Sequence, residues 1–122
     1  MKALLTITVV LEVPFGVAVL VSPALLASIL LGAPLDTPTG LTFARIAGAA
    51  VVALGVACWR ARQDERSRSA IGIVTAMLFY NVVVIAILMY ARLGLGVSSI
   101  VLWPAVVLHV VLAAWCIACL RL

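Results

Sequence analysis

Residues 1–20 read MKALLTITVVLEVPFGVAVL, an apolar run with one carboxylate, Glu12, near its middle. The run is long enough to cross the hydrocarbon core of a bilayer, because a spanning helix needs roughly 20 apolar residues. A charged side chain in the centre of a membrane helix costs about 2.5–3.5 kcal/mol on insertion scales. The segment therefore predicts a membrane helix in which Glu12 has a specific partner or role.

The rest of the chain has the same apolar character. Of its 122 residues, 67% are hydrophobic and 10% are charged, whereas soluble domains have about 45–50% apolar and 25% charged residues. Four apolar stretches lie at about residues 3–21, 39–59, 70–91 and 98–120, separated by charges and turn signals. Helices satisfy their own backbone polar groups inside lipid. We therefore expect one all-α integral membrane domain, residues 1–122, folded as a four-helix bundle.

Lysine and arginine gather on one side of this predicted domain. They lie in the connection between the second and third spans and near the two termini: Arg60, Arg62, Arg66, Arg68, Lys2 and Arg121. By the positive-inside rule this side is cytoplasmic, so we expect both termini in the cytoplasm. The short basic connection also contains Asp64 and Glu65. We expect it to contact the head groups of the lipid bilayer and expect no nucleic-acid partner.

The segment PALLASILL, residues 23–31, follows Ser22, and a Ser-Pro pair is typical of a helix cap and first turn. Nine residues are too few to span a bilayer. The segment either extends the first helix past a kink or forms a short interfacial helix. The sequence leaves both alternatives open. The pair Thr37-Pro38 repeats the cap signal at the start of the second span.

The second span carries small residues at close spacing: Ala44, Gly48, Gly55, Ala49, Ala53 and Ala57. Small side chains allow membrane helices to approach closely enough for extensive backbone contact. We expect this span to pack tightly against a neighbouring helix.

Each predicted span contains one strongly polar residue: Glu12, Arg45, Asn81 and His109. At a rise of about 1.5 Å per residue, Glu12 lies about 12 Å from the cytoplasmic boundary, Asn81 and His109 lie about 15 Å from it, and Arg45 lies about 7 Å below the opposite boundary. Charged groups at such depths face the bundle interior and pair with one another. We expect an ion pair between Glu12 and Arg45, bridged by His109 or by water. Tyr80 adds a hydroxyl group at the same level.

These five residues predict a ligand or ion site, for which three interpretations are open. The leading one is a transporter or permeation protein for protons or a small polar or anionic solute. In it, Glu12 accepts a proton or cation, Arg45 is a counter-ion or anion clamp, and His109 with Tyr80 relays protons. The second is a non-catalytic subunit or assembly factor of a larger membrane complex, in which the polar residues specify the bundle.

The third interpretation is a haem-handling or lipid-handling membrane enzyme. The chain has no phosphate-binding glycine loop and no nucleophile motif, so the sequence favours a protein that is not an enzyme. It contains a single histidine, His109, and a haem held by two imidazoles would need a second copy of the chain in an oligomer. The cysteines Cys58, Cys116 and Cys119 are expected to pack as reduced, apolar thiols, and we expect no metal site.

Two stretches, LTFARIAGAAVVALGVACWRAR (residues 41–62) and GVSSIVLWPAVVLHVVL (residues 96–112), resemble segments of small, uncharacterised four-helix membrane proteins of bacteria. This resemblance implies a bundle in the bacterial inner membrane and implies no activity. The chain length, the four spans and a carboxylate midway in the first span are also similar to the small multidrug resistance transporters.

In that second family, protons and cationic substrate compete for the carboxylate within a homodimer, and the matching residue here would be Glu12. Arg45 and His109 depart from the family pattern, since its helices are typically apolar at such places. An arginine next to Glu12 would repel a cationic substrate, so we expect protons, a zwitterion or an anion instead. Because four helices enclose little volume, we also expect a homo-oligomer or a membrane partner subunit.

Overall fold

The computed structural model of the chain describes residues 1–64 and 66–121, and all regular structure within these ranges is α-helical. The helices are α1 (Lys2–Val21), α2 (Pro23–Leu31), α3 (Pro38–Ala61), α4 (Arg68–Leu93) and α5 (Leu102–Arg121). By length and composition, α1, α3, α4 and α5 could each cross a membrane. The predicted helical bundle is therefore confirmed, and the chain fits a multi-pass membrane protein.

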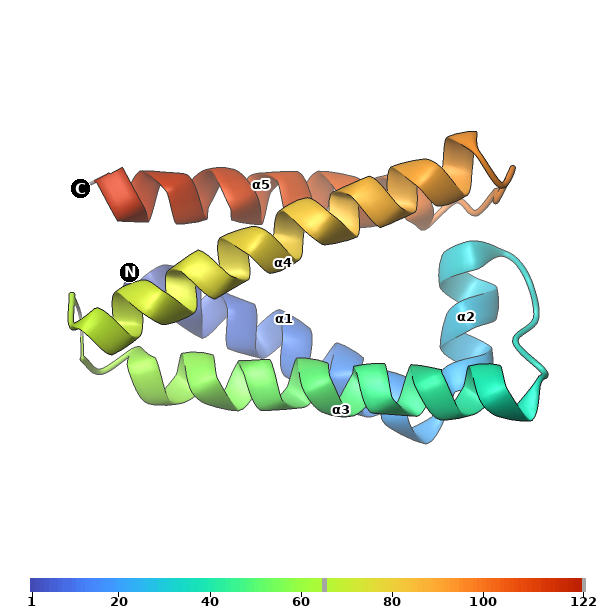
Figure 1. Cartoon of the computed structure of the whole chain (residues 1–122), viewed down its shortest axis with the longest axis horizontal. Helices are drawn as coiled ribbons and strands as arrows, with labels where there is room; N and C mark the ends of the chain where they lie inside the picture. Colours follow the sequence, from blue (N-terminus) through green and yellow to red (C-terminus); the bar gives the residue numbers. More distant parts are fainter. Residues whose placement is uncertain (65, 122) are drawn as a thin grey trace.

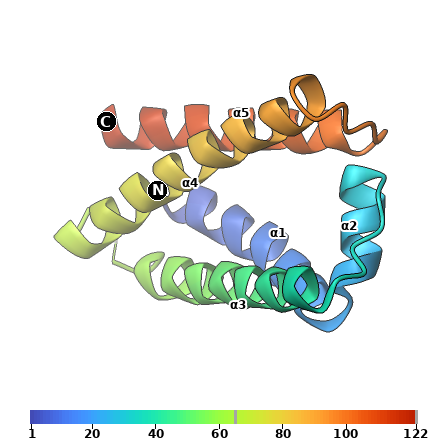
Figure 2. The ribbon, with the colours of Figure 1, turned by 45° about the vertical axis from the view of Figure 1, so that its right-hand side comes forward.

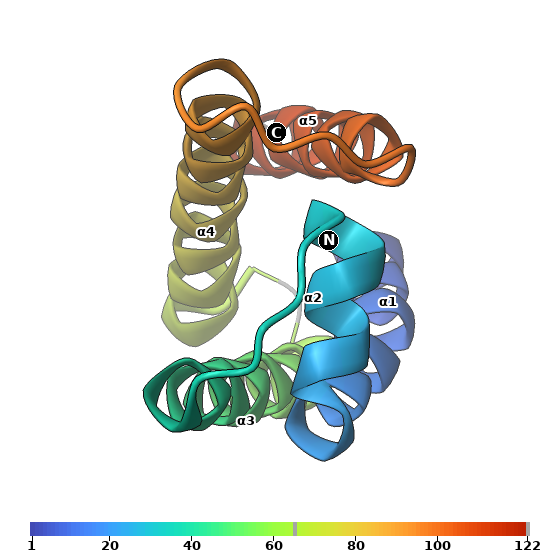
Figure 3. The same cartoon turned by 90° about the vertical axis from the view of Figure 1, so that its right-hand side faces the viewer.

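The four long helices run lengthwise through the molecule, and both chain termini lie at the same end (Figure 1). We call this the terminal end. The short helix α2 stands across the long helices at the opposite end, which we call the α2 end (Figure 2). α1 packs mainly on α3, and α4 packs mainly on α5. Seen from the α2 end, the two pairs surround a central region that α2 flanks (Figure 3).

The buried residues that the structure describes join the two helix pairs in one core near the terminal end. This core contains buried residues from all four long helices: Leu4, Leu5, Cys58, Ala61, Ala70, Val74, Met77, Leu112 and Cys116. A second cluster, of Leu88, Leu102 and Val106, joins α4 to α5 nearer the α2 end, and Leu31 of α2 packs against it. α4 diverges from α3 toward the α2 end (Figure 1). The pairs are therefore held together at one end and separate toward the other.

A break at Ser22 makes α2 a helix of its own. Ser22 has φ −133° and ψ 62°, because the ring of a following proline disfavours the helical conformation in the residue before it. α2 ends at Leu31 and is capped by Gly32, whose φ of 68° favours glycine and where a Cβ would collide with the carbonyl oxygen of Ser98. Ser99 Oγ donates a hydrogen bond of 2.6 Å to the carbonyl oxygen of Ile29. Residues 23–31 thus do not extend α1 but lie against the α4–α5 connection.

Local caps set the starts of α3 and α4. The Thr37 side chain accepts a hydrogen bond from the backbone N–H of Gly40 at 3.1 Å, which confirms the predicted cap. Ser67 Oγ accepts one from the N–H of Ala70 at 3.0 Å, so α4 begins two residues earlier than predicted. α5 begins at Leu102 and not near residue 98, with Pro104 in its first turn, where a helix needs no proline N–H.

Glycines bring α1 and α3 into backbone contact. A Cβ added to Gly16 would lie 2.9 Å from the carbonyl oxygen of Gly48, and one added to Gly48 would lie 2.8 Å from that of Gly16. Gly55 also packs closely on α1, there against the Val13 side chain. The predicted tight packing of this span is confirmed for Gly48 and Gly55. The exposed residues of the span include Ala49 and Ala53, which lie on another face.

Candidate functional site

Glu12 lies on the buried face of α1, between Thr8 and Gly16, each one turn away. Its side chain is 5% exposed. Tyr80 Oη of α4 donates a hydrogen bond to Glu12 Oε2 at 3.4 Å, longer than the 2.5–3.0 Å typical of such bonds. Within residues 1–64 and 66–121, no other hydrogen bond or ion pair reaches the Glu12 carboxyl. The carboxyl group is therefore buried with one weak partner.

Asn81 and His109 form a second, tighter link between α4 and α5. Asn81 is fully buried, and its Nδ2 donates a 2.7 Å hydrogen bond to the carbonyl oxygen of Met77. Its Oδ1 lies 2.7 Å from His109 Nδ1. The His109 ring meets the Tyr80 ring edge to face, with centroids 5.8 Å apart and an interplanar angle of 75°. Glu12, Tyr80, His109 and Asn81 thus form one connected set of polar side chains.

A cavity of about 690 Å³ lies beside this polar set. All five helices contribute to its walls, and among the described residues its only polar side chains are those of Glu12, Tyr80 and His109. These three sit near the middle of their helices, while apolar residues of α2, such as Leu26 and Leu30, line it toward the α2 end. The cavity therefore has a polar end near mid-bundle and apolar walls beyond it.

Arg45 is not part of this site. Its side chain is exposed, and α3 faces the cavity with Ala44, Ala47, Gly48 and Val51. Successive residues of an α-helix point about 100° apart, so Arg45 projects away from the direction in which its neighbour Ala44 faces the cavity. The predicted ion pair between Glu12 and Arg45 is not formed, and the role of Arg45 as anion clamp has no support in the structure.

The structure therefore brings together four of the five predicted site residues. Sequence reasoning missed the contribution of α2, which supplies apolar cavity wall, because a nine-residue helix was expected either to extend α1 or to lie at the interface. The Ser22-Pro23 break is the signal that separates α2 from α1. No sequence signal shows that α2 turns inward against the α4–α5 connection.

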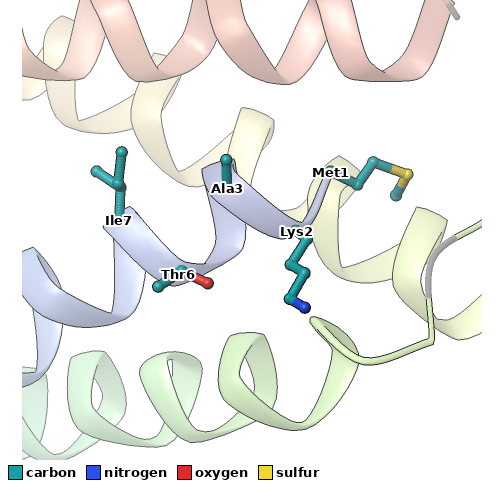
Figure 4. Close-up of a pocket in the computed structure, with 5 residues that line it drawn as sticks. All are labelled: Met1, Lys2, Ala3, Thr6 and Ile7. Atoms are coloured by element: carbon teal, nitrogen blue, oxygen red, sulfur yellow. The ribbon is translucent and has the colours of Figure 1, made fainter.

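A second hollow lies on the surface of α1 at the terminal end, lined by Met1, Lys2, Ala3, Thr6 and Ile7 (Figure 4). It belongs to the first turns of one helix and gathers no set of polar groups from other helices. In the described part of the chain, no three histidine, cysteine or acidic side chains lie together as metal ligands. Cys58 and Cys116 are free, buried thiols in the apolar core. The cavity beside Glu12 is the stronger candidate site.

Comparisons with known protein families, with curated proteins and with solved structures find no match for this chain. The resemblances of residues 41–62 and 96–112 and of Glu12 to known families therefore stay predictions. The polar end of the cavity offers a carboxyl group that can bind a proton or cation, a phenol hydroxyl and an imidazole. Such groups bind and transfer protons or hold a polar head group.

Proposed function

We propose that the chain is a small transport or permeation protein of the bacterial inner membrane, in which Glu12 takes up a proton or a cationic group. The position of Glu12 carries the proposal: its carboxyl group is buried, has one 3.4 Å hydrogen bond and borders a cavity of about 690 Å³. A structural carboxylate at this depth would be expected to have a full set of partners, since an unpaired buried charge is costly. A carboxyl group with unused hydrogen-bonding sites beside a cavity fits a binding site.

The proposed orientation has both termini in the cytoplasm. The two termini and the α3–α4 connection lie at the same end of the bundle (Figure 1), so the basic residues of this connection gather with Lys2 and Arg121. The positive-inside rule assigns such an end to the cytoplasm. The α2 end of the cavity then faces the outer half of the membrane.

Each polar residue of the cavity has a proposed role. Glu12 binds the proton or cation, and Tyr80 passes protons between Glu12 and His109. Asn81 is a positioning residue that fixes the His109 ring. In the part of the chain that the structure describes, no lysine or arginine lines the cavity, so the support for an anionic solute, which depended on Arg45, is lost. We propose protons or a solute with a cationic or hydrogen-bond-donating group as the transported species.

Proteoliposomes that contain a trapped pH-sensitive dye test this proposal. With a potassium gradient and valinomycin imposing a membrane potential, we expect the wild-type protein to conduct protons faster than protein-free vesicles. We expect Glu12→Gln to reduce this protein-dependent flux at least tenfold, because an amide cannot take up a proton at that position.

Arg45→Gln is the matched control, since it also neutralises a charged residue within a long helix but lies outside the cavity. We expect its flux to equal that of the wild type. The proposal fails if the wild type shows no flux above empty vesicles, or if folded Glu12→Gln conducts as well as the wild type.

A second candidate function, a subunit of a larger membrane complex, is favoured by Arg45. This cation is exposed on α3 on the same side as exposed Ala49, one turn away, and small residues allow another helix to approach. A helix of another chain with a carboxylate at this level would pair with it. A symmetric homodimer through this face would place two Arg45 side chains together, so we propose a different chain as the partner.

Purification from native membranes in mild detergent tests this candidate. We expect the wild type and Arg45→Lys to elute with the same partner protein in a fixed stoichiometry. We expect Arg45→Glu to elute without this partner. Arg92→Glu, which changes another helical arginine by the same charge, should retain the partner. A particle that contains only this chain, in every variant, would contradict the subunit function.

A further inference from the structure

The hydrogen bonds of Asn81 determine which nitrogen of His109 carries hydrogen. A carbonyl oxygen can only accept, so the side of the Asn81 amide that faces Met77 O at 2.7 Å must be its NH₂ group. The amide oxygen then faces His109 Nδ1, also at 2.7 Å. An amide oxygen has no hydrogen to donate, so Nδ1 must donate. In the neutral imidazole, Nε2 is consequently an acceptor.

The three polar side chains of the cavity, those of His109, Tyr80 and Glu12, all offer hydrogen-bond acceptors. His109 Nε2 has no hydrogen bond to any residue that the structure describes. Tyr80 directs its hydroxyl hydrogen to Glu12, so its oxygen can accept from a ligand. When it carries no proton, the Glu12 carboxylate has acceptor sites only. Within residues 1–64 and 66–121, no lysine, arginine, serine, threonine, asparagine or glutamine side chain lines the cavity to supply a donor.

We infer that this cavity binds an amphiphile whose head group donates several hydrogen bonds and whose tail is apolar. The inference rests on the proposed function, because it names the substrate class of the same site. A primary ammonium, with three N–H donors, or a vicinal diol, with two O–H donors, matches the acceptors of Glu12, Tyr80 and His109. The apolar walls from α2 hold the tail, and a volume of about 690 Å³ lies within the ~300–1,000 Å³ of ordinary ligand sites.

The single histidine of the chain makes the acceptor at Nε2 directly observable. We would label histidine with ¹⁵N, place the protein in phosphatidylcholine nanodiscs, whose choline head groups contain no hydrogen-bond donor, and record the two ring-nitrogen signals. We expect Nδ1 to carry the proton and Nε2 to carry none. A protonated Nε2 in the neutral ring would overturn the inference before any ligand is added.

Three amphiphiles with the same 12-carbon tail then test the head group. Dodecylamine has charge and donors, 1-monolauroylglycerol has donors without charge, and dodecyltrimethylammonium has charge without donors. We expect at least one donor-bearing compound to shift the Nε2 signal and to bind at least tenfold more tightly than dodecyltrimethylammonium. Tighter binding of dodecylamine would identify an ammonium as the source of the donors, and tighter binding of 1-monolauroylglycerol would identify a diol. The inference would be overturned if dodecyltrimethylammonium bound as tightly as the donor-bearing compounds or more tightly. It would also be overturned if neither dodecylamine nor 1-monolauroylglycerol bound.

A pair of substitutions on α2 locates the tail. Ala27 lines the cavity, whereas Ala24 of the same helix is exposed and lies outside it. We expect Ala27→Trp to weaken binding of the donor-bearing amphiphile at least tenfold with the His109 tautomer unchanged, and Ala24→Trp to bind as the wild type does. Equal binding by both variants would exclude this cavity as the binding site.

These measurements are independent of ion flux. Proton flux without binding of a donor-bearing amphiphile would reject the ligand class and leave the transport function standing. Binding without any effect of Glu12→Gln on flux would reject the transport function and leave the ligand class standing.

Discussion

Gly48→Ala is expected to lower the free energy of unfolding by about 1–3 kcal/mol, the usual cost of inserting a methyl group into a packed contact. The added Cβ would lie 2.8 Å from both the carbonyl oxygen of Gly16 and the backbone nitrogen of Leu20. Both are backbone atoms of α1, so no side chain can rotate to make room. The α1 and α3 helices must therefore move apart, and Glu12 moves with α1.

Gly72→Ala provides the matched control for this prediction. Gly72 lies inside α4 and has nothing within 4 Å of the position of an added Cβ. Alanine there should leave stability unchanged or raise it by up to about 1 kcal/mol, because glycine is a poor helix former. Equilibrium unfolding of detergent-solubilised protein, followed by circular dichroism, measures both variants. If the two variants are equally stable, the backbone contact between α1 and α3 does not exist as described.

Asn81→Leu is expected to destabilise the protein by about 1–3 kcal/mol, the cost of leaving a buried polar group without a partner. Leucine has the same branching and the same number of side-chain heavy atoms as asparagine but cannot accept the hydrogen bond from His109 Nδ1. The same substitution removes the constraint on the His109 ring. We therefore expect the two ¹⁵N signals of the histidine to show a mixture of tautomers in place of one.

Thr75→Val is the control for Asn81→Leu. The Thr75 hydroxyl donates to the carbonyl oxygen of Ile71 at 2.9 Å, one turn earlier in α4, as the Asn81 amide donates to Met77, but Thr75 is exposed. We expect its loss to change stability by less than about 0.5 kcal/mol and to leave the His109 signals as in the wild type. A single, unchanged tautomer in Asn81→Leu would show that Asn81 does not orient His109.

Tertiary contacts account for the parts of the site that sequence reasoning missed. The rise per residue is the same in every helix, so the level of Glu12, Asn81 and His109 along the bundle could be predicted. The direction in which a side chain projects depends on which helix face is packed. α3 offers small residues on two faces, one with Gly48 and one with Ala49, and is apolar nearly all round. The sequence of α3 therefore has no amphipathic pattern that indicates which of these two faces is buried. For this reason Arg45 was expected to face the bundle interior, whereas it is exposed.

The sequence by itself determined four long apolar helices, their approximate limits, the break at Ser22-Pro23 and the levels of the polar residues, because these depend on composition and on local backbone preferences. Only the tertiary structure decided that α1 packs on α3 through Gly16 and Gly48, and that α2 turns across the bundle. It also decided that Glu12 faces Tyr80 while Arg45 faces outward. These features depend on steric fit between helices far apart in the chain, which local sequence patterns do not encode.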